Sequence, residues 1–259
     1  MSTLTSEPPA LRAPDASSNK YSRGKVLVIG GAMPGAAHLC AQAAMRSGAG
    51  YVELATERPA AQPPYALVQR GWAPELLTDD RIGAIAIGPG LADDEAGQDK
   101  LSAVLATGKP AVIDAGALTI LAHLGFQMLG RTHVLTPHEG EFARLFGPIV
   151  ADRLNAVRDA AQASGAYVLL KGSETIIATP ERQAIVMPPA SPWLSTAGTG
   201  DVLTGVIATM LAQAQWHGFD TLEAIRAACW LHARAAELAG PALIADDLLW
   251  SLKRAVAKA

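Results

Sequence analysis

Short, uninterrupted apolar runs that alternate with longer helix-forming segments constrain the fold of this chain more than any other feature. A strand with one face in water alternates polar and apolar residues, whereas these runs stay apolar throughout. We therefore expect them to be strands of a sheet that is covered by helices on both faces. The expected strands are 25–30, 51–55, 84–87, 111–114 and 133–136.

The segments between these runs are rich in alanine, leucine and other helix-forming residues. Helices that alternate with buried strands predict βαβ units and a mainly parallel sheet. The expected helices are 35–47, 95–107, 117–124 and 139–146.

The pattern changes after Gly165, where three short strands follow one another with hairpin-like connections. A turn at Thr179-Pro180-Glu181-Arg182 separates the last two of them. Three further helices are expected after the hairpins. The strands are 167–171, 175–178 and 184–187, and the helices are 199–215, 221–238 and 246–256. No repeat or linker is visible, which favours a flexible segment over residues 1–22 and one α/β domain over residues 23–259.

The composition excludes several classes of protein. The net charge of −3 and the absence of a basic block argue against a nucleic-acid partner. The longest apolar stretch, 202–214, is shorter than the roughly 20 residues that a membrane span needs, and the N-terminus lacks the pattern of a secretory signal. Cys40 and Cys229 form neither a disulfide framework nor a metal-ligand spacing, which fits the reducing cytoplasm.

The turn Gly198-Thr199-Gly200-Asp201 opens directly onto an apolar helix and carries the sharpest chemical signal. Small residues there let the backbone amides of Ala197 to Gly200 point at one anion, which the helix dipole also favours. Asp201 could then accept a proton from a substrate hydroxyl as that oxygen attacks a phosphoryl group. The alternative is that Asp201 only stabilises the start of the helix.

Lys171 ends an expected buried strand and is followed by Gly172, Ser173, Glu174 and Thr175. A cation, a glycine and hydroxyl groups at a strand end fit a phosphate-contacting edge. The same residues also fit an ordinary hairpin with a surface lysine. The downstream glycine turn favours the first interpretation.

A third segment, 136–142, lies where a strand ends and a helix starts, the edge at which open α/β sheets bind ligands. His138 could contact substrate there, and Glu141 could hold Mg²⁺ through water. In the competing structural account, Thr136 caps the helix, Pro137 is its first residue and Glu139 completes a capping box. The segment lacks a second histidine in helical register, which argues against zinc.

Two glycine-rich strand ends, 29–37 and 87–91, complete the expected edge. Gly30, Gly31 and Gly35 do not have the spacing of a dinucleotide-binding fingerprint, and no Gly-Lys-Ser/Thr of a P-loop follows. We interpret both segments as places where the backbone approaches something bulky.

These segments, taken in order, resemble the ADP/ATP-dependent NAD(P)H-hydrate dehydratases of the ribokinase superfamily over roughly residues 24–257. The motif at 197–205 is shared with many superfamily kinases. The motifs that single out the dehydratases are Pro-Gly-Ala-Ala at 34–37 and Thr-Pro-His-x-Gly-Glu at 136–141. The matching segments are 30–37, 46–50, 88–91, 136–141, 170–172 and 197–205.

The resemblance implies a ribokinase-like three-layer sandwich and repair of hydrated NADH and NADPH. ADP or ATP, with Mg²⁺, would phosphorylate the ring hydroxyl, after which phosphate leaves and the ring is restored. Bacterial members generally use ADP. The resemblance implies that Asp201 is the base. It also implies binding roles for three further groups of residues. Ala36, Gly90 and His138 would line the hydrate pocket, Lys171, Gly172, Ser173, Glu174 and Thr175 would flank the nucleotide, and Gly200 with the adjacent amides would hold the transferring phosphate.

Further expectations also follow from the family. They are a homotetramer and an epimerase supplied as a separate protein, since too few residues precede the first strand for an epimerase domain. Ala92 and Gly116 depart from the family pattern, which often has Gly and Asp there. Two other functions stay open. One is a superfamily kinase of a small vitamin-precursor alcohol, and the other is a non-catalytic nucleotide-binding regulator, against which the intact turn argues.

Overall fold

The computed structural model describes residues 7–61, 64–150 and 152–259. Its centre is a nine-stranded sheet in the order β3-β2-β1-β4-β5-β6-β7-β8-β9. The pairs from β3 to β7 are parallel, and β8 and β9 join the edge antiparallel. The strands are β1 (Lys25–Ile29), β2 (Tyr51–Ala55), β3 (Val68–Arg70), β4 (Ile82–Ile87), β5 (Ala111–Ile113), β6 (His133–Leu135), β7 (Tyr167–Leu170), β8 (Ile176–Ala178) and β9 (Ala184–Val186).

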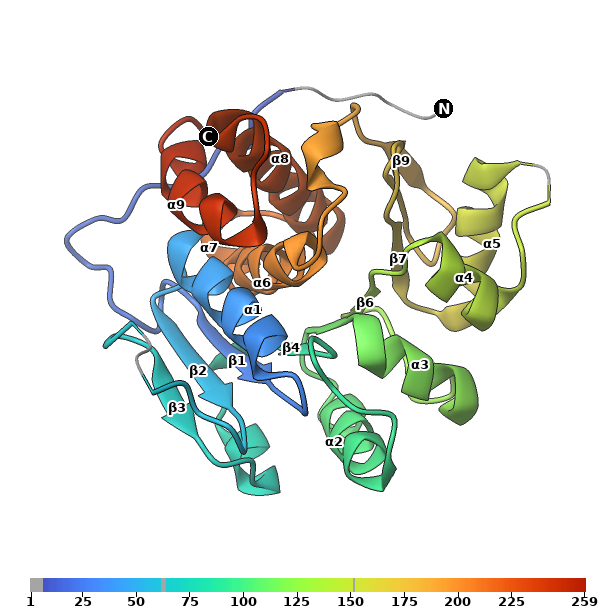
Figure 1. Ribbon diagram of the computed structural model, residues 1–259, viewed down its shortest axis with the longest axis horizontal. Coiled ribbons are helices and arrows are strands. Elements are labelled where there is room, and N and C mark those ends of the chain that lie inside the picture. Colours follow the sequence, from blue (N-terminus) through green and yellow to red (C-terminus); the bar gives the residue numbers. More distant parts are fainter. Residues whose placement is uncertain (1–6, 62–63, 151) are drawn as a thin grey trace.

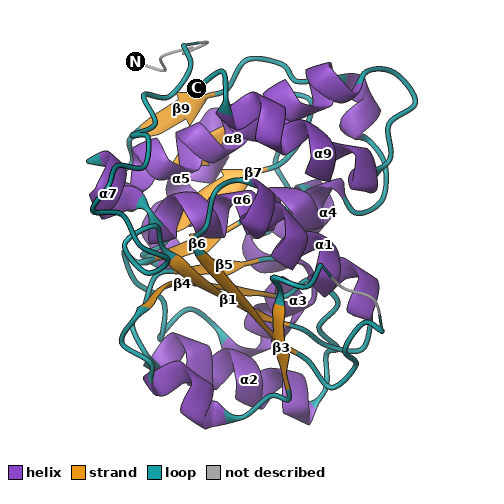
Figure 2. Ribbon diagram, turned by 90° about the vertical axis from the view of Figure 1, so that its left-hand side faces the viewer, coloured by secondary structure: helices purple, strands orange, loops and turns teal. Residues whose placement is uncertain are grey.

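Helices cover both faces of this sheet (Figure 1, Figure 2). On one face lie α1 (Pro34–Arg46), α6 (Thr199–Ala212), α8 (Thr221–Ala239) and α9 (Ala245–Val256). On the other face lie α2 (Glu95–Ala106), α3 (Ala115–Leu124), α4 (Glu139–Phe146) and α5 (Arg153–Ser164). The remaining short elements are α7 (Ala214–His217), η1 (Pro74–Thr78) and η2 (Pro192–Leu194).

The strand β1 explains why the sequence lacks polar alternation. Val26 and Val28 belong to the core beneath α1 and α6, whereas Leu27 and Ile29 belong to the core beneath α2 and α3. All four side chains are fully buried, so both faces of the strand select apolar residues. The predicted three-layer sandwich with a mainly parallel sheet is therefore confirmed.

The strand β3, the helix α5 and the 3-10 helices η1 and η2 were not predicted, and one expected helix is divided. β3 has only three residues, two of them polar, and pairs with one neighbour at the sheet edge. α5 does carry standard signals, with Asp152 as its N-cap and Gly165 in the left-handed conformation after it. The single helix expected over 199–215 ends at Ala212, and α7 begins at Ala214.

The start of the chain makes specific contacts from Glu7 onward. The carbonyl of Glu7 accepts a hydrogen bond from Arg226, and the amide of Arg12 donates to Nδ1 of His217. Residues 1–6 lie outside the described residues. The flexibility expected of residues 1–22 stays a prediction.

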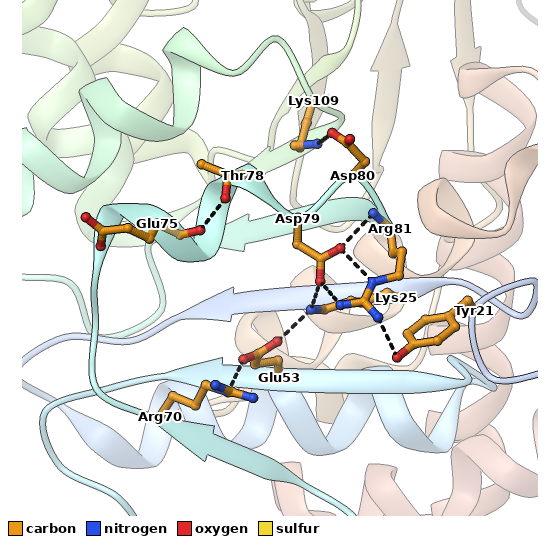
Figure 3. Close-up of polar contacts among 10 residues, drawn as sticks. All are labelled: Tyr21, Lys25, Glu53, Arg70, Glu75, Thr78, Asp79, Asp80, Arg81 and Lys109. Carbon is orange, nitrogen blue, oxygen red and sulfur yellow. Dashed lines mark hydrogen bonds and ion pairs between the residues drawn. The ribbon is translucent and has the colours of Figure 1, made fainter.

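An ion cluster surrounds Lys25, the first residue of β1, at the end of that strand opposite to the one expected to bind ligands (Figure 3). The buried ammonium of Lys25 lies 2.7 Å from Glu53 and 2.8 Å from Asp79. Arg70 and Arg81 pair with the two carboxylates from the outer side. Each carboxylate therefore has cationic partners, which fits a structural role for the cluster. Among the described residues no helix combines the length and the apolar character that crossing a membrane requires.

Candidate functional site

The turn before α6 has the geometry that its glycines predict. Gly198 is the N-cap with φ +87°, a left-handed conformation, and a Cβ there would come within 2.7 Å of Leu39. The hydroxyl of Thr199 donates to the carbonyls of Leu194 and Thr196, which ties the turn to the segment before it. Asp201 consequently lies in the first turn of the helix.

Gly200 brings the start of the helix close to Lys171. A Cβ on Gly200 would lie 3.6 Å from Nζ of Lys171, and outside its neighbours and the backbone of its own helix it would meet no other described atom within 4 Å. An ammonium beside free amides at a helix N-terminus attracts an anion more strongly than either feature alone. The arrangement therefore fits the predicted anion site.

Asp201 has an unusual proton affinity. Burial, with a further contribution from the negative charge of Asp114, raises the pKa of Asp201 to about 6, and Lys171 offsets only part of this. A carboxylate that merely stabilised a helix N-terminus would have its charged form favoured and its pKa lowered. The raised pKa of Asp201 supports its interpretation as a base.

Asp114 connects the elements around this carboxylate. It is 1% exposed, and its two oxygens accept hydrogen bonds from Lys171 Nζ at 2.7 Å and from Thr204 Oγ1 at 2.7 Å. Lys171 also lies 3.8 Å from Glu141. Burial opposes the charge of Lys171, but the charges of Asp114 and Glu141 outweigh it and raise the pKa of the amine. Lys171 is thus a fixed cation among three carboxylates.

The structure corrects the expected capping of α4. The helix begins at Glu139, and its N-cap is His138, whose Nδ1 accepts from the amides of Gly140 and Glu141. Glu141, not Glu139, completes the capping box by accepting from the amide of His138 at 2.8 Å. Thr136 lies two residues before the N-cap, which is too early to cap the helix. Its buried hydroxyl donates instead to the carbonyl of Ile113.

This cap also fixes the chemistry of the His138 ring. Because Nδ1 accepts two backbone hydrogen bonds, the proton of the neutral ring is assigned to Nε2. The side chain is 60% exposed, and its Nε2 lies 3.6 Å from Glu141. A capping role and a substrate contact through Nε2–H are therefore compatible.

The glycine-rich strand ends approach one another. A Cβ on Gly90 would lie 2.2 Å from the carbonyl oxygen of Met33, and one on Gly31 would lie 2.5 Å from that of Gly90. A Cβ on Gly116 would likewise lie 2.1 Å from the carbonyl oxygen of Leu91, so there is no room for a side chain at this position. The lack of side chains at Gly31, Gly90 and Gly116 lets these backbone segments pack closely on one another. The interpretation that the strand ends also approach a bulky ligand stays a prediction. The contact between Met33, the N-cap of α1, and Gly90 places the first turn of α1, which contains Ala36, near the loop of Gly90.

The segment after β7 is open at its tip. The amide of Lys171 donates to the carbonyl of Pro137, which holds the ends of β6 and β7 together. Beyond it, Ser173 and Glu174 are exposed, and the Thr175 hydroxyl lies 3.4 Å from the Gly172 carbonyl that it faces. The side chains of Ser173 and Glu174 make no hydrogen bond to other described residues.

The sequence interpretation missed Asp114 and His232 as site residues. Nε2 of His232 lies 3.0 Å from the carbonyl of Thr199, and burial lowers the pKa of this histidine to about 4. The neutral ring therefore holds the helix start from α8. No local motif marks either residue, because each acts on a partner far away along the chain.

The carboxylates fit Mg²⁺ only as an ion carried by a nucleotide. Asp114 has both oxygens engaged, and no group of three or more His, Cys, Asp or Glu side chains within the described ranges is arranged to hold a metal. Mg²⁺ commonly keeps several waters and binds through one or two carboxylates plus phosphates. Glu141, whose Oε1 has no backbone partner among the described residues, and Asp201 match that requirement.

Residues 26–253 match the sequence profile of the NAD(P)H-hydrate dehydratase family, and the chain belongs to this family. The ADP-dependent (S)-NAD(P)H-hydrate dehydratase of Neisseria meningitidis is 37% identical over 89% of this chain and 82% of that protein. The bifunctional NAD(P)H-hydrate repair enzyme of Mycobacterium tuberculosis is 41% identical over 77% of this chain. The matched region is only 43% of that bifunctional enzyme, so the chain spans less than half of its length.

A solved structure agrees with these sequence relatives. The ADP/ATP-dependent NAD(P)H-hydrate dehydratase of Bacillus subtilis, co-crystallised with ATP and Mg²⁺, has a TM-score of 0.81 and 31% identity. The match covers 96% of this chain and 94% of that one. The predicted family and the ribokinase-like fold are confirmed.

Proposed function

We propose that the chain is an ADP-dependent NAD(P)H-hydrate dehydratase that repairs hydrated NADH and NADPH. The observation that carries this proposal is the partly buried carboxylate of Asp201, with a pKa of about 6, beside Lys171 and a helix N-terminus. A base with a pKa near the working pH and an anion site next to it are what phosphorylation of an alcohol requires. Family membership directs the proposal to the hydrate.

Asp201 accepts the proton of the ring hydroxyl while that oxygen bonds to the terminal phosphorus of ADP. The bond between this phosphorus and the bridging oxygen breaks, and AMP leaves with its electron pair. The ring phosphate ester then loses phosphate, the ring nitrogen supplies the electrons, and a proton leaves the neighbouring carbon. The products are NAD(P)H, AMP and inorganic phosphate.

The residues around this step divide between the two substrates. Ala197, Gly198, Thr199 and Gly200 offer amides to the transferring phosphoryl group. Lys171 to Thr175 flank the nucleotide, and Ala36, Gly90 and His138 contact the hydrate. Lys171 is held by Asp114, so it neutralises developing charge without having to reorganise.

Mg²⁺, bound to the nucleotide and approached by Glu141, would neutralise phosphate charge. ATP as an alternative donor, a homotetramer, a separate epimerase partner and a cytoplasmic location stay predictions from the family resemblance.

Product analysis separates this function from that of a superfamily kinase. Incubation with ADP, Mg²⁺ and NADH hydrate should release AMP and inorganic phosphate in equal amounts. A kinase would leave its phosphoryl group on a stable alcohol ester and release no phosphate. Accumulation of a stable phosphorylated product would exclude the dehydratase.

The pH profile should report Asp201. The base must be ionised, so we expect kcat to be constant above neutrality and to fall about tenfold per pH unit below about 6. Measurement of kcat from pH 4.5 to 8.5 checks this limb. A kcat that stays nearly constant down to pH 4.5, as the usual aspartate pKa of 3.8 would give, would show that burial and Asp114 do not tune the base.

A further inference from the structure

Arg153, the first residue of α5, extends its side chain to the end of β7. Nη1 donates to Glu139 at 2.8 Å. Nη2 lies 2.6 Å from the point where a Cβ on Gly172 would stand, so a side chain at that position would have to displace the guanidinium. The absence of a side chain at residue 172 therefore leaves room for the cation.

Most donors of this guanidinium have no partner among the described residues. Nε is buried and unpaired, and Nη2 makes no hydrogen bond to the described part of the chain. An arginine has five N–H donors, and only one is engaged here. Arg158, on the same helix, also leaves Nε unpaired, so the unpaired atom alone does not decide the question.

The position of Arg153 in the site favours a ligand-binding role over a purely structural one. Gly172 follows Lys171, whose ammonium faces Gly200 at the helix N-terminus. Lys171 is already balanced by Asp114 and Glu141. A nucleoside diphosphate brings several negative charges to this edge, and Arg153 is a nearby cation that still has free donors. Its fork of N–H groups matches the geometry of phosphate oxygens.

The geometry points to Arg153 as a binding residue for the phosphates of the nucleotide donor, placed over Gly172 for that purpose. This inference rests on the proposed function, because it takes the segment Lys171 to Thr175 as the nucleotide side of the site. It adds to that function a phosphate contact from α5. The competing role is a structural ion pair that joins α5 to α4 through Glu139.

Calorimetric titration of the full chain with adenosine, AMP and ADP, in the presence of Mg²⁺, tests the inference. Arg153→Gln should weaken ADP binding about 10- to 100-fold and leave adenosine binding unchanged, because charged hydrogen bonds to phosphate are lost. Arg158→Gln removes the same charge from the same helix and should leave all three affinities unchanged. Glu139→Gln breaks the ion pair but keeps the cation, so ADP affinity should be retained.

Gly172→Ala provides a second route that leaves the arginine in place. It should weaken ADP binding, and the double variant with Arg153→Gln should bind ADP no more weakly than Arg153→Gln alone. Additive losses would contradict the role of Gly172 in placing the guanidinium.

Three results would overturn the phosphate contact. They are unchanged ADP affinity in Arg153→Gln, an equal loss for adenosine, or the same loss in Glu139→Gln. Normal ADP binding by the wild-type protein without turnover of the hydrate would instead contradict only the proposed dehydratase activity. Failure of the wild-type protein to bind any adenine nucleotide would contradict both.

Discussion

Replacement of Asp201 by Asn should lower kcat about 10²- to 10⁴-fold, the usual contribution of a general base. The amide has the same shape as the carboxylate and keeps the start of α6, but it cannot accept the proton of the hydroxyl. ADP binding should survive, because the amides of the turn and Lys171 are unchanged. Steady-state kinetics and ADP titration on the same preparation measure both quantities.

The same variant should be more stable than the wild type, which distinguishes loss of the base from damage to the fold. The pKa of Asp201 is raised from 3.8 to about 6 in the folded state, so the folded protein binds this proton more tightly than the unfolded chain does. The stabilising effect of that proton is present below about pH 4 and is lost as the pH rises through 6. At pH 7.5 Asp201→Asn should therefore raise the free energy of unfolding, by on the order of 1–2 kcal/mol for a partly solvated group. Near-normal turnover, or a less stable variant, would contradict this account of Asp201.

Gly88→Ala should cause the largest loss of stability that we expect from a single added methyl group. Gly88 has φ +126°, and its Cβ would lie 1.7 Å from the carbonyl oxygen of Asp114. Backbone strain and overpacking against another backbone together predict a loss on the order of 3–5 kcal/mol. Chemical denaturation of the wild type and the variant measures it.

Gly108→Ala is the matched control, because Gly108 also has a positive φ of +64° but its Cβ would meet no described atom within 4 Å. The control should lose only about 1 kcal/mol. Similar losses in the two variants would show that the contact between Gly88 and Asp114 is unimportant. A selective loss would show that close packing of the loop after β4 on the backbone of Asp114 stabilises the fold.

The sheet could be predicted from the sequence because its signal is local. Each buried strand, such as Lys25–Ile29, meets helices on both faces and is therefore apolar along its length. β3 lacks that signal, because Val68–Arg70 is a short edge strand with two polar residues, and its position depends on pairing with β2. The division between α6 and α7 likewise has no glycine or proline to mark it.

The candidate site was only partly visible in the sequence. Asp201 and Lys171 stand in glycine-rich motifs, and the structure brings them together. Asp114 bonds to residues 57 and 90 positions away, and such contacts leave no trace in local spacing. His138 caps α4, but histidine is not among the usual N-cap residues, so the sequence pattern favours Thr136 as the cap instead. The substrate contact of His138 stays a prediction. Gly116 could not be explained until the fold placed Leu91 against it.

The recovery of NADH from its hydrate tests the central claim most directly. With ADP and Mg²⁺, the purified protein should restore the absorbance of the reduced nicotinamide, and omission of the nucleotide should abolish the recovery. Asp201→Asn under the same conditions should show no more than about one hundredth of the rate. No recovery by the wild-type protein with either ADP or ATP would contradict the assignment of this chain as a hydrate dehydratase.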